Sequence, residues 1–259
     1  MPRKTIYLPG PTTQDSTQHH LVPEAVVVGD MLFTGGIAGA DPVTGRLPAT
    51  NEEQAALAYD RLEIILAEAG YSKDQVAHWF IWAPDRHTQI SPVNPHWERW
   101  FPNPQSRPAR HALSRQLDPG QHYRIEIVGV KTGARRAYEI NSTVYHTGGS
   151  ATPGFMPFGA NVGDILFTGP TYGMYAANRT MGETALKQAE LCRELNRDLF
   201  RMAGFTEDNI TQMFVWYHDD AARTAAVSYT ATMYPDPHDR PAVHYLHSTL
   251  PYWAEVQGQ

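Results

Sequence analysis

Four short segments in the first half of the chain recur in the second half, in the same order. Three of them recur at one identical offset, and the offset of the fourth is shorter by a single position. Separated matches at one spacing predict two copies of one fold. The copies differ most clearly at Arg110, which corresponds to Val243 in the second copy. The repeated segments are LFTG at 32–35 and 166–169, AG at 69–70 and 203–204, Phe80-Ile81-Trp82 and Phe214-Val215-Trp216, and Arg107-Pro108-Ala109 and Arg240-Pro241-Ala242.

The size and charge of the chain limit what it can be. Its 259 residues are enough for two domains, which we place at 1–132 and 133–259. A formal net charge of −6 argues against a nucleic-acid partner, because phosphate binding requires a basic face. No apolar stretch approaches membrane-spanning length and the polar N-terminus carries no secretion signal, so we expect a cytoplasmic protein with no membrane partner. A single cysteine, Cys192, excludes an internal disulfide.

Each copy shows the same order of expected elements: a short strand, a hairpin, a long helix, a strand, a shorter helix and two strands. Strands that alternate with helices, with hairpins at both ends, predict an α+β fold in which each copy has a mixed sheet with two helices on one face. The linker at 131–136 is expected to be short and ordinary. The expected elements lie at 5–8, 25–28, 31–34, 51–69, 76–82, 95–100, 109–117 and 123–130 in the first copy, and at 138–140, around 163–164, 186–203, 210–216, 221–233, 242–250 and 253–257 in the second.

Arg110 and Glu126 are the residues best suited to chemistry. Arg110 follows Pro108 on an expected strand, and a guanidinium held at a groove can grip a carboxylate with two parallel bonds. Glu126 lies on the next expected strand and could hold or activate a water molecule if it faces the same groove. From spacing alone, the favoured alternative to a binding role is an ion pair between Arg110 and Glu126 that stabilises two adjacent strands.

Glycines beside the first hairpin are further candidates for a binding site. Gly35 and Gly36 follow the strand that ends at Thr34, and consecutive glycines there permit a close approach of backbone to a ligand. The second copy has Pro170 in place of the second glycine, which removes a backbone donor. The twelve histidines include no metal-ligand spacing such as HExxH, so we expect no metal and no cofactor.

Read in order, these segments resemble the Rid/YjgF family of reactive-intermediate deaminases over about residues 21–130, and a second time over about 135–257. The resemblance implies two tandem chorismate-mutase-like domains that assemble as a homotrimer, with ligand clefts between neighbouring domains. It also implies that Arg110 binds the substrate carboxylate and that Glu126 helps the hydrolysis. The family's tyrosine before the hairpin is missing here. The segments that carry the resemblance are VGDMLFTGG at 28–36, DPVTG at 41–45, AGYS at 69–72, FP at 101–102, RPAR at 107–110 and IEI at 125–127.

The leading hypothesis for function is a hydrolase that cleaves a C–N bond in a small carboxylate-bearing metabolite, either an enamine, an imine or a 2-aminomuconate type of acid. Arg110 would anchor the carboxylate and Glu126 would position water. The backbone of Thr34, Gly35 and Gly36 would complete the cradle, with Arg107 and Arg240 as further substrate-binding candidates. Two alternatives remain open: a non-catalytic metabolite-binding or regulatory trimer of the same fold, and a chorismatase-like hydrolase.

Overall fold

The chain forms two compact units. The computed structural model describes residues 3–8, 22–85, 91–139, 156–175, 178, 180–248 and 256–258. One unit comprises Met1–Ala137 with Ala160–Phe167, and the other comprises Tyr138–Gly159 with Thr168–Gln259. Below, "first half" and "second half" refer to the two sequence copies, because the first unit also contains the hairpin at 160–167 from the second copy.

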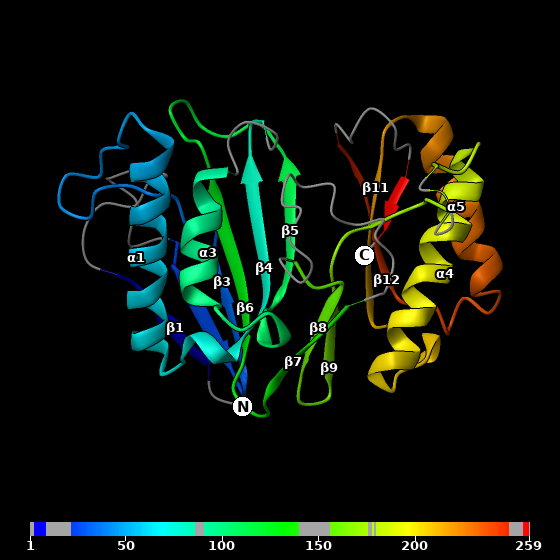
Figure 1. Cartoon of the computed structure of the whole chain (residues 1–259), viewed down its shortest axis with the longest axis horizontal. Helices are drawn as coiled ribbons and strands as arrows, with labels where there is room; N and C mark the ends of the chain where they lie inside the picture. The colour runs from blue at the N-terminus through cyan, green and yellow to red at the C-terminus, as the bar shows by residue number, and fades with distance from the viewer. Residues whose placement is uncertain are drawn as a thin grey trace. The chain divides into compact units, whose positions relative to one another are not determined.

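The first half is built on one six-stranded sheet with the order β1-β2-β3-β6-β4-β5 (Figure 1). Only the β4–β5 pair is parallel, and the remaining pairs are antiparallel. The strand β6 therefore lies between β3 and β4, and β5 forms an edge of the sheet. The strands are β1 Arg3–Ile6, β2 Ala25–Val28, β3 Met31–Thr34, β4 Val76–Ala83, β5 Ala109–Ser114 and β6 Arg124–Val130.

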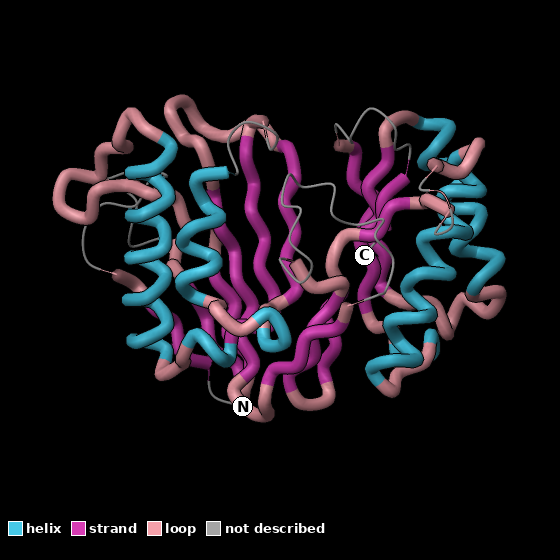
Figure 2. Tube along the Cα trace, viewed as in Figure 1, coloured by secondary structure: helices cyan, strands magenta, loops and turns pink. Residues whose placement is uncertain are grey.

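Two helices cover one face of this sheet, α1 (Asn51–Ala69) and α3 (Asn94–Trp100) (Figure 2). The side chain of Thr50 accepts a hydrogen bond from a free backbone N–H in the first turn of α1, and Gly70 ends this helix at a φ of 74°, in the left-handed region. Tyr59 of α1 and Trp97 of α3 both pack against Trp79 of β4, with ring centroids 5.1 and 5.8 Å away. From His78 onward, odd-numbered residues of β4 thus face the helices and even-numbered ones face the opposite side, because a register irregularity between Val76 and His78 interrupts the alternation at the start of the strand.

The second half repeats the helices and divides its strands between two sheets. Helices α4 (Ala185–Ala203) and α5 (Asp220–Met233) pack on the sheet β10-β13-β11-β12, through an apolar cluster that includes Ala189, Val215 and Ala226. The hairpin strands form a separate sheet, β7-β8-β9. The strands are β7 Arg135–Tyr138, β8 Gly159–Val162, β9 Ile165–Thr168, β10 Thr171–Tyr172, β11 Gln212–Tyr217, β12 Ala242–His247 and β13 Val256–Gly258.

The register of the parallel strand pair is the same in the two halves, residue by residue. In the first half Trp79 pairs with Arg110, and in the second Met213 pairs with Val243, which places valine where the first half has arginine. A second shared detail is a glycine pressed against the long helix. A Cβ on Gly39 would lie 1.7 Å from the backbone oxygen of Gln54, and one on Gly173 would lie 2.2 Å from the Cα of Gln188. The α+β class expected from the sequence is therefore present in both halves.

Strand ends differ slightly from the expected ones. The first strand begins earlier, because Arg3 and Lys4 extend along Val27 and Val28 at an exposed edge where polar side chains are tolerated. The last expected strands of the second half, 242–250 and 253–257, are only partly seen, since 249–255 lie outside the described residues. Residue 140 of the expected strand 138–140 also lies outside them.

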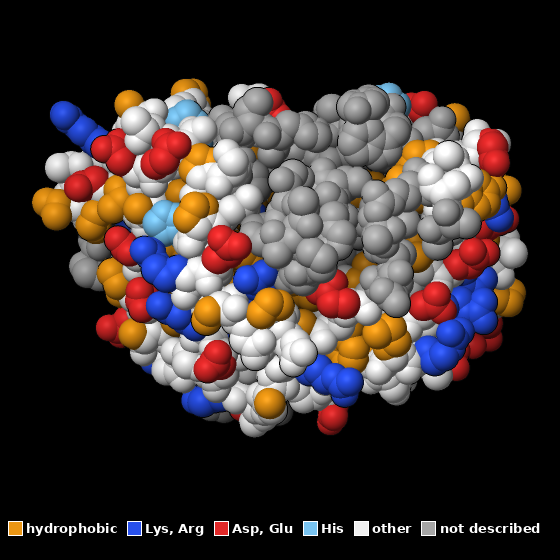
Figure 3. All heavy atoms as spheres, in the orientation of Figure 1, with side chains coloured by type: hydrophobic (Ala, Val, Ile, Leu, Met, Phe, Trp, Pro, Cys, Tyr) orange, Lys and Arg blue, Asp and Glu red, His pale blue; other side chains and the backbone are white. Residues whose placement is uncertain are grey.

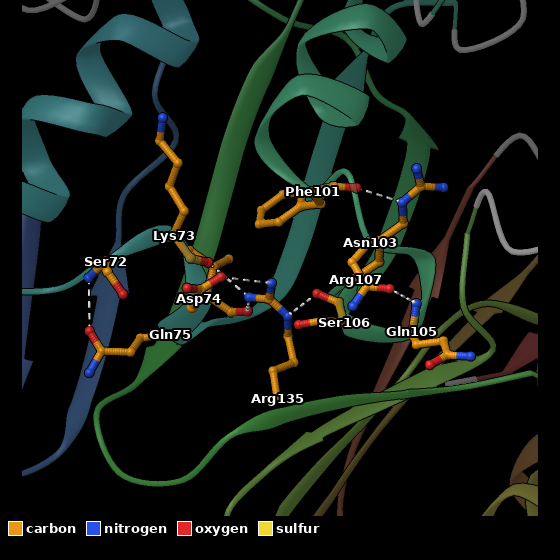
Figure 4. Close-up of polar contacts among 11 residues, drawn as sticks. Ser72, Lys73, Asp74, Gln75, Phe101, Asn103, Gln105, Ser106, Arg107 and Arg135 are labelled. Carbon is orange, nitrogen blue, oxygen red and sulfur yellow. Dashed lines mark hydrogen bonds and ion pairs between the residues drawn. The ribbon is translucent and has the colours of Figure 1, made fainter.

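The linker holds a buried arginine that the sequence did not single out (Figure 4). Arg135 lies at the start of β7, and its guanidinium donates to the backbone oxygens of Ser106, Lys73 and Val76 at 2.6–2.8 Å. Burial lowers the pKa of Arg135 to about 10, with Asp74 opposing this shift. The expectation of an ordinary linker is therefore wrong for its last two residues, which begin a strand anchored to the first unit.

Candidate functional site

Arg110 lies under the N-terminal turn of α3, on the helix-covered face of the sheet. It is 1% exposed, and its Nη2 donates to the side-chain oxygen of Asn94 at 2.9 Å. Its guanidinium carbon lies 4.9 Å from the ring centroid of Trp97, a cation–π contact. Asn94 and Trp97 stand three residues apart on α3, so both point to the same side of that helix. These two residues were not predicted as part of the site.

Burial lowers the pKa of Arg110 without removing its charge. Desolvation lowers the pKa of Arg110 to about 10; Tyr59 opposes this shift and Arg107 adds to it. The guanidinium therefore stays charged at neutral pH in a buried position. A carboxylate brought to it would stabilise this charge, since opposite charges attract strongly away from bulk water.

The second half lacks this whole set of side chains. At the end of the shorter helix, the backbone N–H of Phe101 and that of Tyr234 each donate to the carbonyl oxygen four residues earlier, which aligns Trp97 with Thr230. The same offset aligns Asn94 with Val227 and, through the strand registers, Arg110 with Val243. The fold therefore forms with and without the guanidinium and its two neighbours.

Glu126 lies on the opposite face of the same sheet. Its strand position pairs with Phe80 of β4, which stacks on Trp82 with ring centroids 5.7 Å apart. Burial raises the pKa of Glu126, while the Trp82 indole, Arg115 and Arg124 oppose this shift. A Cβ on Gly36 would lie 3.6 Å from the Glu126 carboxylate, so the predicted glycine does lie beside it.

Arg110 and Glu126 are not brought together within the first half. The strand β4 lies between β5 and β6, so the two residues are on non-adjacent strands and on opposite faces. The alternative of an ion pair bracing adjacent strands is therefore wrong. The spacing was misleading because β6 follows β5 in the sequence and yet pairs with β3 and β4.

Thr34 and Gly35 serve the sheet in this structure. The hydroxyl of Thr34 accepts from the backbone N–H of Ile127 at 2.9 Å, which ties the end of β3 to β6. The N–H of Gly35 donates to the backbone oxygen of Glu24 at 2.8 Å. Of the three predicted cradle residues, Gly36 is the one that lies beside the Glu126 carboxylate.

Arg107 and Arg240 occupy equivalent places in the two halves. Arg107 Nε donates to the backbone oxygen of Phe101 at 2.8 Å, and Arg240 Nε donates to that of Tyr234 at 2.9 Å. Each arginine thus holds the carbonyl that ends the shorter helix. This shared contact gives both residues a role in the fold, and their predicted contribution to substrate binding stays a prediction.

Neither a cluster of metal-ligating side chains nor a membrane-spanning helix is found in the described parts of the chain. Within them, no group of three His, Cys, Asp or Glu side chains is placed to hold a metal ion. No helix in the same ranges is both long and apolar enough to cross a bilayer. On the face drawn in Figure 3, acidic and basic side chains are interspersed rather than separated by sign.

Comparison with known proteins identifies the family. Residues 13–131 match the family described as endoribonuclease L-PSP. The RutC family protein of Aquifex aeolicus is 30% identical over 109 residues, which cover 42% of this chain and 86% of that protein. The RutC family protein PM1466 of Pasteurella multocida is 30% identical over 111 residues, covering 42% of this chain and 85% of that protein. The chain belongs to the Rid/YjgF family.

Solved structures of the same kind cover about half of the chain. The YjgF gene product of E. coli is 24% identical, with 49% of this chain and 98% of that one covered and a TM-score of 0.43. NMB1025 of Neisseria meningitidis, a member of the YjgF protein family, is 24% identical, with 52% and 98% covered and a TM-score of 0.41.

Proposed function

We propose that this protein binds a small imine or enamine through its carboxylate at Arg110 and hydrolyses its C–N bond. The observation that carries the proposal is the buried, charged guanidinium of Arg110 with Asn94 and Trp97, a set that the second half replaces as a whole while keeping the fold. A buried cation that the fold does not require is best explained by a ligand.

The reaction is written for 2-iminobutyrate. Water adds its oxygen to the imine carbon and gives up one proton, and the imine nitrogen becomes an amine. The proton of the new hydroxyl group then passes to this nitrogen, the carbon–oxygen double bond forms as the C–N bond breaks, ammonia leaves and 2-oxobutyrate remains. Arg110 holds the carboxylate of substrate and product with two parallel bonds throughout.

Glu126 is proposed as the group that takes the proton from water. A carboxyl whose pKa is raised by burial is better matched to proton transfer near neutral pH than an ordinary glutamate. Because Glu126 and Arg110 of one half lie on opposite faces of the sheet, they cannot both reach one substrate molecule, so this role requires the Glu126 of a second copy of the chain. It is therefore tested separately from carboxylate binding.

The same separation favours a second candidate function, namely carboxylate binding without turnover. In that case Arg110 alone forms the site, and Glu126 takes no part. Ammonia release and calorimetric binding of 2-oxobutyrate distinguish the two functions.

The deciding experiment compares three proteins with 2-iminobutyrate and 2-aminomuconate as substrates. Wild type is expected to release ammonia. Arg110→Met is expected to lose at least tenfold in kcat/KM, because a hydrogen bond to a charged group is worth roughly 1.5–3 kcal/mol. The matched control is Arg201→Met, the same change at an exposed arginine of α4 paired with Asp198.

Two outcomes would change the assignment. Equal rates in all three proteins would refute the role of Arg110. Binding of 2-oxobutyrate to wild type without ammonia release would replace the deaminase with the binding function.

The family description names a ribonuclease, and RNA cleavage is therefore a further arm of the experiment. A net charge of −6 disfavours binding of an RNA backbone. Cleavage of RNA by wild type, retained in Arg110→Met, would contradict both proposed functions.

A further inference from the structure

The buried side chain of Arg135 bridges three elements of the first half. Its Nε donates to the backbone oxygen of Ser106 at 2.6 Å, shortly before β5. Its Nη1 donates to the backbone oxygens of Lys73 and Val76, at 2.8 and 2.6 Å, where β4 begins. The guanidinium carbon lies 4.9 Å from the ring centroid of Phe101, the residue at the end of α3. Figure 4 shows the guanidinium between these segments, so one side chain ties the approaches to β4 and β5 to the end of α3.

The same three elements carry the residues around Arg110. Trp79 of β4 pairs with Arg110 of β5. Asn94 and Trp97 of α3 contact the Arg110 guanidinium. The geometry of this set is therefore determined by how α3 lies on the β4–β5 pair. A binding site needs its groups held to within about half an ångström, which residues outside the site provide.

A continuous row of packed groups joins the two guanidinium groups. The ring of Phe101 lies against Trp97, with centroids 4.7 Å apart and an interplanar angle of 65°. Arg135 contacts Phe101 at one end of this row, and Arg110 contacts Trp97 at the other, each with its guanidinium carbon 4.9 Å from the ring centroid. Both rings are buried. Because a close-packed interior transmits a displacement, a change at Arg135 is felt at Arg110.

The repeat shows that the strand position of Arg135 does not by itself demand burial. In each half, one backbone hydrogen bond joins the end of the first strand to the residue before the hairpin. These bonds run from Glu24 to Ile6 and from Phe158 to Tyr138. They align Arg135 with Arg3 of β1, which is exposed. The burial of Arg135 thus comes from its contacts with the half that carries Arg110.

We propose that Arg135 is a positioning residue for the Arg110 site, because it holds α3 against the β4–β5 pair. Asn94 and Trp97 of that helix then keep Arg110 in the geometry that receives a carboxylate. Arg135 belongs to the second sequence copy, so this copy contributes to the site of the first. The identity of the ligand rests on the proposed function, and the positioning itself does not.

The test replaces Arg135 with lysine in the full chain. Arg135→Lys keeps the positive charge, but an ammonium group does not reproduce the planar fork that reaches several carbonyl oxygens. The matched control is Arg3→Lys, at the corresponding exposed position of β1. Circular dichroism checks that each variant is folded.

The first readout is the Kd for 2-oxobutyrate, measured by calorimetry. Arg135→Lys is expected to raise this Kd roughly tenfold or more, since a displacement of about 1 Å can cost a hundredfold. Arg3→Lys is expected to leave it unchanged. An unchanged Kd in folded Arg135→Lys would overturn the proposal.

Phe101→Leu removes the ring contacts of the row and leaves the backbone bonds of Arg135 in place. It is expected to raise the Kd as well. The double variant Phe101→Leu/Arg135→Lys is expected to lose no more affinity than the more affected single variant, because both changes act through one row of contacts. Losses that multiply would show independent effects and overturn the proposal. If Arg135→Lys does not fold, an unchanged Kd in Phe101→Leu overturns it instead.

The second readout needs no ligand. It is the indole N–H resonance of Trp97 in an NMR spectrum, assigned with Trp97→Phe. This resonance is expected to move in Arg135→Lys and to stay in place in Arg3→Lys. If wild type neither binds 2-oxobutyrate nor releases ammonia, the proposed function fails, and the resonance still decides the positioning role. A resonance that does not move in Arg135→Lys would overturn it.

Discussion

Replacing Arg110 with methionine tests whether this guanidinium serves a ligand or the fold. Its pKa is lowered from 12.5 to about 10, which corresponds to roughly 3 kcal/mol of destabilisation at neutral pH. The sign follows because the folded state binds this proton less tightly than the unfolded chain, so the penalty applies at any pH below about 10. Opposing it are the cation–π contact, worth about 0.5–2 kcal/mol, and the bond to Asn94, worth about 1.5–3 kcal/mol. The balance is close to zero.

We therefore expect Arg110→Met to change the free energy of unfolding by less than about 2 kcal/mol, because the lost contacts and the relieved desolvation nearly cancel. The double variant Asn94→Leu/Arg110→Met, which leaves no amide behind, should be at least as stable as the single one. The matched comparison is Arg135→Met. Arg135 has a similarly lowered pKa, but its loss leaves three backbone oxygens without their bonds, which should destabilise the protein by roughly 3 kcal/mol or more.

Urea denaturation measures both changes, with and without 2-oxobutyrate. At a ligand concentration of about 100 times Kd, wild type should gain about 2.7 kcal/mol, and Arg110→Met should gain none. If Arg110→Met loses as much stability as Arg135→Met, the guanidinium is a structural element. Equal stabilisation of wild type and Arg110→Met by the ligand would also refute the assignment.

Three further predictions follow from individual residues. As the pH is lowered, the rate of ammonia release should begin to fall at a pH above 4.5, because the raised pKa of Glu126 is crossed there. Glu126→Gln should abolish most activity. A pH–rate profile that is unchanged in this variant would exclude Glu126 as the proton acceptor. Burial and the nearby His111 hold the pKa of His78 well below 6.5, so the free energy of unfolding should decline as pH falls below 6.5, by up to about 1.4 kcal/mol per pH unit. His78→Gln, measured by urea denaturation across pH, should flatten that decline. Gly39→Ala should unfold or strongly destabilise the protein, since its Cβ would meet the backbone of α1 at 1.7 Å, whereas Gly35→Ala, with 3.7 Å to the nearest atom, should retain its melting temperature in a thermal scan.

Features set by neighbouring residues could be predicted from the sequence. The long helix begins after Thr50 and ends at Gly70, because a side-chain cap and a left-handed glycine act within one turn. The hairpin turn at Gly29 follows from the same kind of local signal. The repeated segments align Arg110 with Val243, and the parallel registers of the two halves place these residues at equivalent positions.

Features set by long-range pairing could not be predicted. The sequence does not indicate which face of the sheet Arg110 occupies. Arg110 and its neighbour His111 are both buried, so β5 lacks the alternation of polar and apolar residues that would distinguish the two faces. The separation of Arg110 from Glu126 depends on the insertion of β6 between β3 and β4. The burial of Arg135 depends on backbone oxygens from distant segments of the first half, and a pair of arginines in a short linker gives no hint of them.

The two faces of the sheet differ in what the second half keeps. On the face away from the helices, Phe80, Trp82 and His111 return as Phe214, Trp216 and His244, with the same ring contacts. On the helix-covered face, Asn94, Trp97 and Arg110 are replaced by Val227, Thr230 and Val243. Residues needed by the fold alone would have no reason to differ between faces in this way. The face away from the helices is the one that receives a hairpin in the first unit, where Phe167 stacks on His78. The helix-covered face carries the buried cation Arg110 in the first half alone, so ligand binding is expected at one half of each chain.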